Sequence, residues 1–290
     1  MHSNNTRSNH EYEIDSFRPE DATGIVRLFK AVYGDGYPIK IYYDQDKLIE
    51  ANRTGEFHSV VARTPEGQVI GNHNLVRSAP HALTYEWAAG LVLSEFRAYG
   101  VTGKIVDYML NELAPRTEVE EIFGEPTLTQ ILIQKMSVGL KFVETALEVG
   151  LMPASLYSKE KSAADRVSTL LQFRCYKPRP QKVFVPRCYE EEIRFLYSVL
   201  DDERTLVEAA EKTRAEGAAD ISIRVFDFAQ VARVAVNHPG ADFEARFREV
   251  ENVALDRNVV VIQVWLRLDS PVVSAAVDVL RSKEIGRAHV

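Results

Sequence analysis

The chain has 290 residues, of which 46% are hydrophobic and 27% are charged, so it can build one large domain or two ordinary ones. Its formal net charge of -7 argues against a general role in nucleic-acid binding, because phosphate backbones are bound by basic surfaces. The two cysteines, Cys175 and Cys188, have neither a metal-binding spacing nor a disulfide-framework spacing, which favours a reducing compartment.

The first ten residues are polar and lack the apolar stretch of a secretory signal, and we expect them to form a disordered tail. No apolar run reaches the roughly 20 residues that a membrane-spanning helix needs. We therefore expect a cytoplasmic protein with no membrane partner, no nucleic-acid partner and no metal site.

The first part of the chain alternates between strand and helix patterns. Asp21 is placed to cap a helix whose apolar side chains recur at helical spacing, and a Pro-Glu-Gly turn at residues 65–67 predicts a hairpin. The predicted order is strand, helix, helix, three strands, helix, strand, helix and two strands, over residues 11–17, 21–34, 43–56, 57–65, 68–78, 84–94, 101–114, 120–127, 129–140, 141–157 and 166–178.

A proline-containing linker at residues 178–182 precedes a second unit. In this unit Ser270 and Pro271 are placed as the cap and first position of a final helix. The predicted order is strand, helix, two strands, helix, strand and helix, over residues 183–186, 188–201, 219–228, 230–238, 242–257, 258–268 and 270–284.

The element order of residues 12–178 and the segment VLSEFRAYGVTG (residues 92–103) together resemble the GNAT N-acetyltransferase superfamily. The strand that begins KFVET, after the second helix of that region, adds to the likeness. The family's central motif places Arg or Gln, then Gly, then Gly or Ala, at positions held here by Arg97, Gly100 and Thr102. Thr102 departs from that pattern, and Gly103 follows it.

A glycine-rich turn that opens a helix is suited to bind an anion. The first N–H groups of a helix have no intrahelical partner, and the helix dipole makes that end slightly positive. The resemblance implies that the anion is the pyrophosphate of acetyl-CoA, held by Arg97, Ala98, Tyr99, Gly100, Val101, Thr102, Gly103 and Lys104. The alternative is that Gly100 only ends a loop.

The preceding strand contains Gly90, Leu91 and Val92, which the resemblance places against the pantetheine arm of the cofactor. Val92 is then the candidate N–H donor that polarises the thioester carbonyl. The alternative is that these residues are ordinary core strand.

Transfer to an amine also needs a base. Glu86 precedes Val92 by six residues on the same strand, so alternation predicts that both lie on one face, and the resemblance favours Glu86 as the general base. The alternatives are a surface or substrate-recognition role for Glu86, and His73 as the base.

The general acid of many family members is a tyrosine placed shortly before a Gly-Phe pair. Here the pair is Lys141-Phe142, and the family spacing leads back to Ser137 instead of a tyrosine. Tyr157 is the candidate substitute, and transfer without a dedicated acid is the alternative.

We expect an α+β fold with a mixed, mostly antiparallel sheet flanked by helices in a GNAT-like domain over residues 11–178. Residues 179–290 are expected to form a second, smaller GNAT-like unit without a cofactor site; an unrelated α+β domain is the alternative. The final residues, EIGRAHV, back-translate to what looks like a sequencing-adapter read. We therefore expect residues 284–290 to be translated adapter and the second unit to lack its closing strands.

The resulting expectation is an N-acetyltransferase that binds acetyl-CoA and an amine acceptor and transfers the acetyl group directly in a ternary complex. A homodimer is compatible with the resemblance. The loops at residues 33–43 and 73–86 are expected to shape the acceptor pocket, and the sequence does not identify the acceptor. The alternative function is a catalytically weak acyl-CoA-binding regulatory or protein-interaction module, which the departures at Thr102, Ser137 and Lys141 keep open.

Overall fold

The computed structural model describes residues 11–157, 165–178, 180–200, 203–210 and 215–285. The expected tail at residues 1–10 and residues 286–290 of the adapter-like end lie outside this part. The chain divides into two compact units between Ile122 and Phe123. This division falls inside strand β5 (Glu121–Gly124), well before the domain boundary expected at residue 178.

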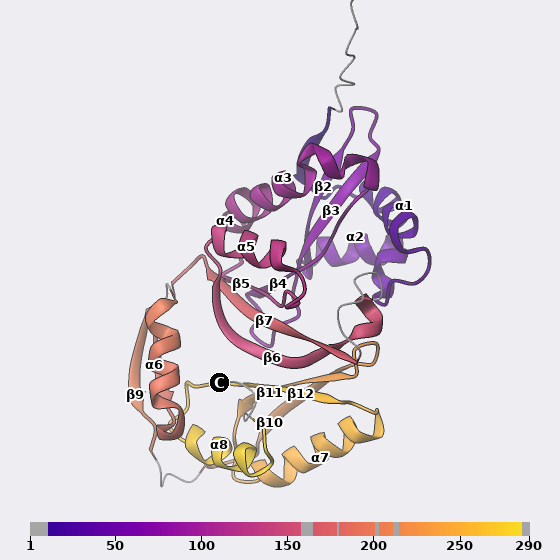
Figure 1. Ribbon diagram of the computed structural model, residues 1–290. Helices are drawn as coiled ribbons and strands as arrows, with labels where there is room; N and C mark the ends of the chain where they lie inside the picture. The colour runs from indigo at the N-terminus through magenta and orange to yellow at the C-terminus, as the bar shows by residue number, and fades with distance from the viewer. Residues whose placement is uncertain (1–10, 158–164, 179, 201–202, 211–214, 286–290) are drawn as a thin grey trace, which may run out of the picture. The chain divides into compact units, whose positions relative to one another are not determined.

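The first unit is a twisted antiparallel sheet with helices on both faces. Its strands are hydrogen-bonded in the order β1-β2-β3-β4, and α3 covers one face while α1 and α2 cover the other (Figure 1). Its elements are β1 (Glu13–Ser16), α1 (Asp21–Tyr33), η1 (Lys40–Tyr43), α2 (Gln45–Arg53), β2 (Phe57–Arg63), β3 (Val69–Val76), β4 (Thr84–Val92), η2 (Ser94–Tyr99), α3 (Val101–Tyr108), a π-helical turn (Met109–Leu113) and α4 (Ala114–Arg116).

The apolar residues predicted for α1 form the core of this unit. Ile25, Leu28 and Phe29 are fully or almost fully buried, and they pack with residues of α2, β2 and β4. The predicted cap at Asp21 is wrong: no side chain caps α1, and the Asp21 carboxylate instead pairs with the buried guanidinium of Arg63 on β2. Burying Arg63 requires a counter-charge, and this requirement outweighs a local cap.

Strand β5 begins beside the start of β4. The N–H groups of Glu120 and Glu121 both donate to the carbonyl of Leu83, at 2.9 and 3.4 Å. With four residues β5 is less than half as long as β4, which has nine, so the end of β4 continues beyond the reach of β5.

The second unit contains a long antiparallel pair, a short parallel pair and a three-stranded sheet. Strands β6 and β7 are antiparallel, β8 and β9 are parallel, and β11 pairs antiparallel with β10 and parallel with β12. Its elements are α5 (Ile131–Gly139), β6 (Val143–Pro153), η4 (Ala154–Tyr157), β7 (Arg166–Cys175), β8 (Gln181–Val185), η5 (Arg187–Tyr189), α6 (Glu190–Val199), β9 (Arg204–Glu208), β10 (Asp220–Phe226), β11 (Val231–His238), α7 (Phe243–Asp256), β12 (Val261–Leu266) and α8 (Val273–Ser282).

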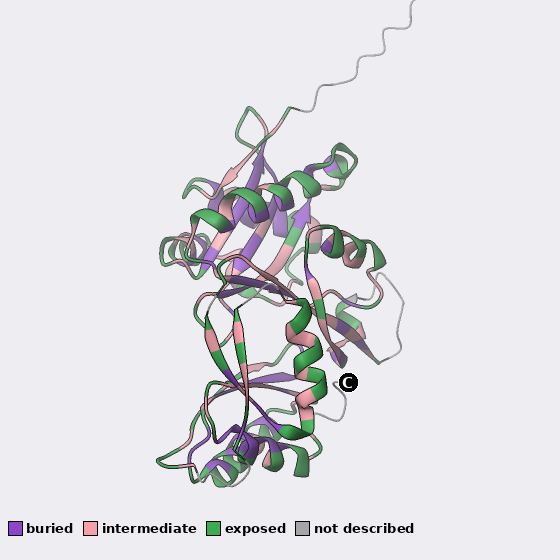
Figure 2. Ribbon diagram, turned by 90° about the vertical axis from the view of Figure 1, so that its left-hand side faces the viewer, coloured by how far each residue is buried: buried purple, intermediate pink, exposed green. Residues whose placement is uncertain are grey.

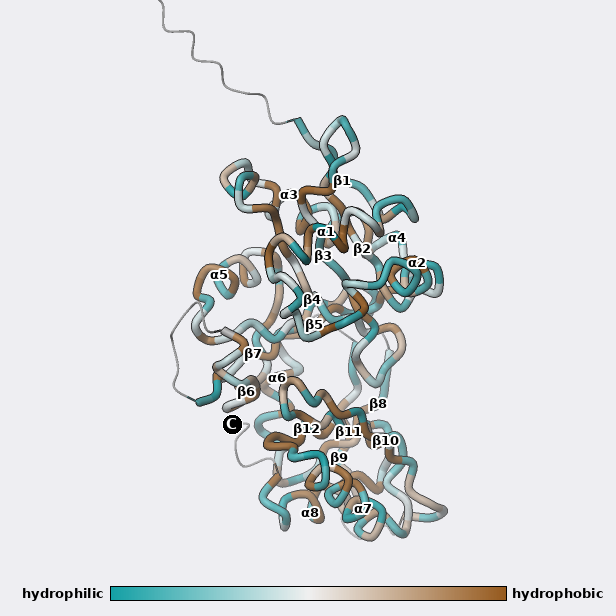
Figure 3. Tube along the Cα trace, turned by 90° about the vertical axis from the view of Figure 1, so that its right-hand side faces the viewer, coloured by the Kyte–Doolittle hydropathy of each residue, from teal (hydrophilic) through white to brown (hydrophobic). Residues whose placement is uncertain are grey.

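Helices α7 and α8 cover one face of the three-stranded sheet. Phe247 of α7 and Val234 of β11 are completely buried in this layer, and the hydrophobic colour in Figure 3 runs along β11 and β12. The predicted cap at Ser270 is wrong, because α8 begins only at Val273 and Ser270 belongs to the preceding turn. Strand β9 was not predicted from the sequence.

The other face of the three-stranded sheet carries a buried polar network. Arg233 of β11 donates to Glu125 at 3.1 Å and to Gln263 of β12 at 3.0 Å, and Gln263 donates to Glu148 of β6 at 2.6 Å. Thr169 of β7 donates to the other oxygen of Glu148. This network ties β6 and β7 to the three-stranded sheet, which accounts for their place in the second compact unit.

The fold is mixed α/β with mostly antiparallel strands and helices on the sheet faces, which confirms the predicted fold class. Figure 2 shows buried strands beneath helices whose outer faces are exposed. No helix in the described ranges is both long and apolar enough to cross a bilayer.

Candidate functional site

Strand β4 carries a β-bulge opposite His73 of β3. The register shifts by one residue between Ala88, which faces Asn74, and Leu91, which faces Asn72. Ala89 has a left-handed φ of 53° in the bulge, and its carbonyl accepts a hydrogen bond from Asn74 Nδ2 at 3.3 Å. A bulge interrupts the ladder and bends its strand, so β4 departs from regular pairing just before the predicted cofactor contacts.

Gly90 is required at the bulge by a close approach of His73. A Cβ atom at Gly90 would lie 2.4 Å from the imidazole ring, so no larger residue fits without moving it. Trp87 Nε1 donates to His73 Nδ1 at 3.3 Å, which calls for the neutral tautomer, and burial lowers the pKa of His73 to about 3. These contacts favour a packing role for His73 over the role of a general base.

The bulge also places the side chains of Glu86 and Val92 on opposite faces of the sheet. The extra residue reverses the alternation, so the face that carries Glu86 continues with Leu91. Leu91 packs into the core under α1, whereas Val92 lies opposite Gly71 on the face covered by α3. The prediction that Glu86 and Val92 share a face is therefore wrong. The backbone N–H of Val92 is unaffected, because it lies in the plane of the sheet.

Glu86 is half-buried on the face covered by α1, and Ser78 Oγ donates to its carboxylate at 2.5 Å. The sequence did not single out Ser78, although it lies in the loop expected to shape the acceptor pocket. From Glu86 to Ala89 the strand is only partly buried, and Gly90 is exposed. The Glu86 carboxylate is therefore not sealed in the core.

The N–H of Val92 points away from β3. Leu93 donates its N–H to the carbonyl of Ile70 at 2.9 Å, and alternate residues of an antiparallel strand direct their N–H groups to opposite sides. The Val92 N–H is thus directed toward the side where β5 is too short to follow. This is the orientation needed of a donor to a ligand bound along β4.

The chain turns into α3 through Gly100, whose φ of 73° and ψ of 14° are left-handed. A side chain there would meet no atom within 4 Å, and Gly103 is equally open. Lys104 donates the first helical hydrogen bond, to the Gly100 carbonyl at 3.1 Å. There is therefore room beside Gly100 and Gly103 at the start of α3, which an anion site there would need.

Neighbouring side chains hold this turn in place. Arg97 Nε donates to the Val92 carbonyl at 3.2 Å, and the Tyr12 hydroxyl donates to the Tyr99 carbonyl at 2.8 Å. Lys104 Nζ lies 4.6 Å from the centre of the Tyr12 ring. The exposed members of the predicted set are Gly90, Arg97, Ala98, Tyr99, Gly100, Thr102, Gly103 and Lys104, while Leu91, Val92 and Val101 are buried.

The predicted acid positions belong to the second unit. Ser137 is completely buried and its hydroxyl donates to the Ile133 carbonyl at 2.9 Å, so it is committed to α5. Lys141 has a left-handed φ of 66°, the conformation that a glycine adopts most easily. Tyr157 ends η4, but its side chain lies outside the described residues, so its role stays a prediction.

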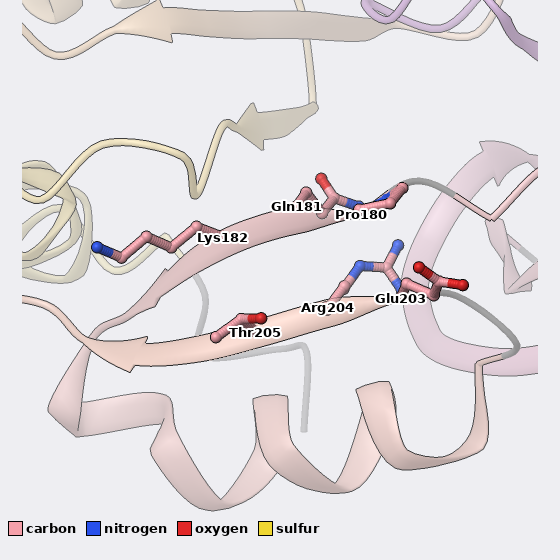
Figure 4. Close-up of a pocket in the computed structure, with 6 residues that line it drawn as sticks. All are labelled: Pro180, Gln181, Lys182, Glu203, Arg204 and Thr205. Atoms are coloured by element: carbon pink, nitrogen blue, oxygen red, sulfur yellow. The ribbon is translucent and has the colours of Figure 1, made fainter.

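Two surface hollows are lined by residues other than Glu86. One, of about 420 Å³, is at the starts of β8 and β9 in the second unit (Figure 4). Arg204, which lines it, lies over the Tyr197 ring. The other, of about 470 Å³, is lined by Lys104 and Tyr12 but also by Glu11 and Glu13, whose charges disfavour a phosphate. Neither is lined by Glu86 or Val92.

No protein-family model and no curated protein matches the sequence. Among solved structures, a GNAT-family acetyltransferase from Streptococcus pneumoniae is similar over 57% of this chain and 100% of its own, at 12% identity and a TM-score of 0.48. Ribosomal-protein-S5-alanine acetyltransferase from Vibrio fischeri is similar over 57% of this chain and 92% of its own, at 12% identity and a TM-score of 0.45. Ard1 from Thermoplasma volcanium is similar over 57% of this chain and 97% of its own, at 18% identity and a TM-score of 0.39. At such identities the activity has to follow from this chain's own residues.

Proposed function

We propose that this protein is an acetyl-CoA-dependent N-acyltransferase that transfers an acetyl group directly to an amine in a ternary complex. The observation that carries the proposal is the open left-handed turn at Gly100, which begins α3 directly after the bulged end of β4. An anion site and a strand end with an outward N–H thereby follow one another along a single stretch of chain.

The residues of the turn fit the donor. The free N–H groups at the start of α3 would receive the pyrophosphate, and Arg97 and Lys104 are close enough in sequence to reach outer phosphates. Gly90, Leu91 and Val92 would line the pantetheine arm, with the Val92 N–H as the donor to the thioester oxygen. Acetyl-CoA supplies an activated thioester when it is bound.

Glu86 supplies the base. The acceptor nitrogen must be unprotonated to attack the thioester carbon, and Glu86 accepts the proton that the amine loses, directly or through water. The carbon–sulfur bond breaks, and the departing sulfur takes a proton from Tyr157 or from solvent. Ser78 orients the Glu86 carboxylate through its 2.5 Å hydrogen bond.

The test combines binding and chemistry. Titration calorimetry should detect acetyl-CoA binding, and a mixture of amines should release free thiol from acetyl-CoA in the presence of the protein. An acceptor-library screen then identifies the amine. Absence of both binding and thiol release would refute the proposal.

A second candidate is an acyl-CoA-binding regulatory module. The observation in its favour is Ser137, which holds the position of the family's usual acid and is buried and bonded within its own helix. This candidate predicts acetyl-CoA binding without thiol release for any amine in the library.

A further inference from the structure

An aromatic cluster formed by Phe29, Tyr33, Tyr37 and Tyr42 lies on the same face of the first sheet as Glu86. Tyr42 stacks on Phe29 with ring centres 4.2 Å apart, and Tyr37 meets the edge of both rings at 5.0 and 5.6 Å. Tyr33 continues the series, 4.9 Å from Tyr37. All four residues come from the end of α1 and the loop that follows it.

The loop that carries the cluster is held closed. The Tyr43 hydroxyl donates to the Gly34 carbonyl at 2.8 Å and accepts from the Tyr37 N–H at 2.9 Å, so one side chain bridges both ends of the loop. Ligand binding to such a preorganised surface costs little ordering entropy.

The cluster runs from the core to the surface. Phe29 and Tyr42 are buried at 0% and 1% exposure, Tyr37 is half-buried, and Tyr33 is 44% exposed. Aromatic faces are thus available to a ligand at the outer end, while the inner end is fixed by packing.

The inner end of the cluster lies near the proposed reaction site. Phe29 and Tyr42 belong to the core that includes Leu91, and Tyr37 packs against this core, as do Ala89, Leu93 and Val76. Val76 lies opposite Glu86. Burial raises the pKa of Tyr42, and the Glu86 charge adds to that rise, while Arg97 acts in the opposite direction on Tyr33. The ring contacts therefore lead from the core beside Val76 and Glu86 outward to Tyr33.

Charge near the cluster is suited to a single ammonium group. On this face of β3 and β4, Glu86 is the one carboxylate; its neighbours are Asn72, Asn74, Val76, Ala88 and Leu91. The loop itself carries one cation and one anion, Lys40 and Asp35, and Lys40 Nζ donates to the Asp35 and Tyr37 carbonyls. Glu86 is thus the carboxylate that matches one ammonium group on this face of β3 and β4.

Building on the proposed function, we infer that the acceptor is a primary monoamine with a flat aromatic body, whose ring lies against Tyr33 and Tyr37 while its nitrogen reaches Glu86. Aromatic rings prefer offset or edge contacts with other rings, which this surface offers. A polyamine or a lysine side chain presents no ring, and a polyamine brings additional positive charges for which this face of β3 and β4 has no second carboxylate.

The test is an acceptor comparison at saturating acetyl-CoA, with phenethylamine, butylamine, spermidine and a lysine-containing peptide as probes. Phenethylamine should have the highest kcat/KM of the four. Tyr33→Ala should raise the KM for phenethylamine about 3- to 10-fold, the usual value of one aromatic contact, and leave butylamine and acetyl-CoA affinity nearly unchanged. Tyr99→Ala is the matched control, since Tyr99 is also 44% exposed but lies in the donor turn; the phenethylamine-to-butylamine ratio should survive it.

The outcomes separate this inference from the proposed function. Preference for spermidine or the peptide, or an unchanged ratio in Tyr33→Ala, would overturn the aromatic acceptor and leave the acyltransferase standing. Absence of acetyl-CoA binding and of thiol release with every probe would overturn both.

Discussion

The two units contain the same local architecture, a strand followed by a turn and a helix, with opposite results at the turn. In the first unit β4 leads through Gly100 into α3, and a side chain at Gly100 would meet nothing within 4 Å. In the second, β11 leads through Gly240 into α7, and a Cβ at Gly240 would lie 2.2 Å from the backbone of Ala218 and Ala219. One turn is open and the other is filled by the chain itself.

In the second unit, hydrogen bonds to residues 217 and 219 also occupy polar groups at the start of α7. Ala241 donates its N–H to the Gly217 carbonyl at 2.9 Å, and the Asp242 carboxylate accepts from the Ala219 N–H at 2.6 Å. A carboxylate at that helix end would also repel a phosphate. A strand, turn and helix in sequence therefore do not by themselves leave room for an anion, because the helix end must also keep free N–H groups and open space.

The largest expected effect is on turnover and concerns Glu86, the proposed base in the unit with the open turn. Glu86→Gln should lower turnover by roughly 10²- to 10⁴-fold on a true acceptor while leaving acetyl-CoA affinity nearly unchanged, because only the proton acceptor is lost. Steady-state kinetics and calorimetry measure the two quantities. Glu66→Gln, an exposed carboxylate in the β2–β3 turn, is the matched control. Full turnover in Glu86→Gln at every pH would assign the base to another group.

The second prediction tests the open turn itself. Gly100→Asp should weaken acetyl-CoA binding by roughly 100- to 1,000-fold, because a carboxylate would face the pyrophosphate at short range. Gly67→Asp is a close control: Gly67 also has a left-handed φ, of 83°, and its missing side chain also meets nothing within 4 Å. Equal affinities in the two variants, measured by calorimetry, would place the donor elsewhere.

Sequence patterns predicted most of the scaffold around these turns. The helical spacing of Ile25, Leu28 and Phe29 and the turn at residues 65–67 depend on local periodicity and turn chemistry, which single segments display. Long-range choices were not visible: Asp21 is engaged by Arg63 on another element, and β9 is a short strand with no fully buried residue.

The turn at Gly100 was predicted from the sequence, whereas the geometry of β4 was misjudged. The turn could be found because glycine marks a left-handed conformation. The bulge could not, because Ala89 adopts a positive φ without being glycine, and one extra residue reverses the alternation that joined Glu86 to Val92. Such strain is held by tertiary contacts, here Asn74 and His73, which local patterns do not reveal.

The third prediction tests the filled turn. Gly240→Ala should destabilise the second unit by about 1–3 kcal/mol or more, because its Cβ would overlap backbone that cannot rotate away. Gly100→Ala should cost only the strain of a left-handed alanine, about 1 kcal/mol. Urea denaturation followed by fluorescence compares the two. A smaller loss at Gly240 than at Gly100 would contradict the contrast between the turns.

The fourth prediction concerns how the stability of the second unit depends on pH. Burial raises the pKa of Glu125 to about 7, and the charge of Glu148 adds to the rise. Because the pKa is raised, the folded state binds more protons than the unfolded state between pH 4.5 and pH 7. The contribution of Glu125 to the free energy of unfolding is therefore full below pH 4.5 and is lost as the pH rises through 7, at up to about 1.4 kcal/mol per pH unit. Glu125→Gln should remove this slope and stabilise the protein at pH 8 relative to the natural chain, as thermal melts at several pH values would record. An unchanged slope would mean that the pair shares no proton.

The smallest expected effect concerns the left-handed residues of the two units. Among the described residues the first unit uses glycine at four such positions and alanine at Ala89, whereas the second uses glycine at two and other residues at four, including Lys141. Lys141→Gly should therefore stabilise the second unit by about 0.5–1 kcal/mol, since glycine relieves a left-handed strain of about 1–2 kcal/mol but loses more entropy on folding. Lys135→Gly, an exposed position inside α5, makes the same exchange in a helical conformation and should destabilise by about 1 kcal/mol. Urea denaturation of both variants reads the difference, and a loss of stability in Lys141→Gly would show that the lysine side chain makes a compensating contact that the second unit depends on.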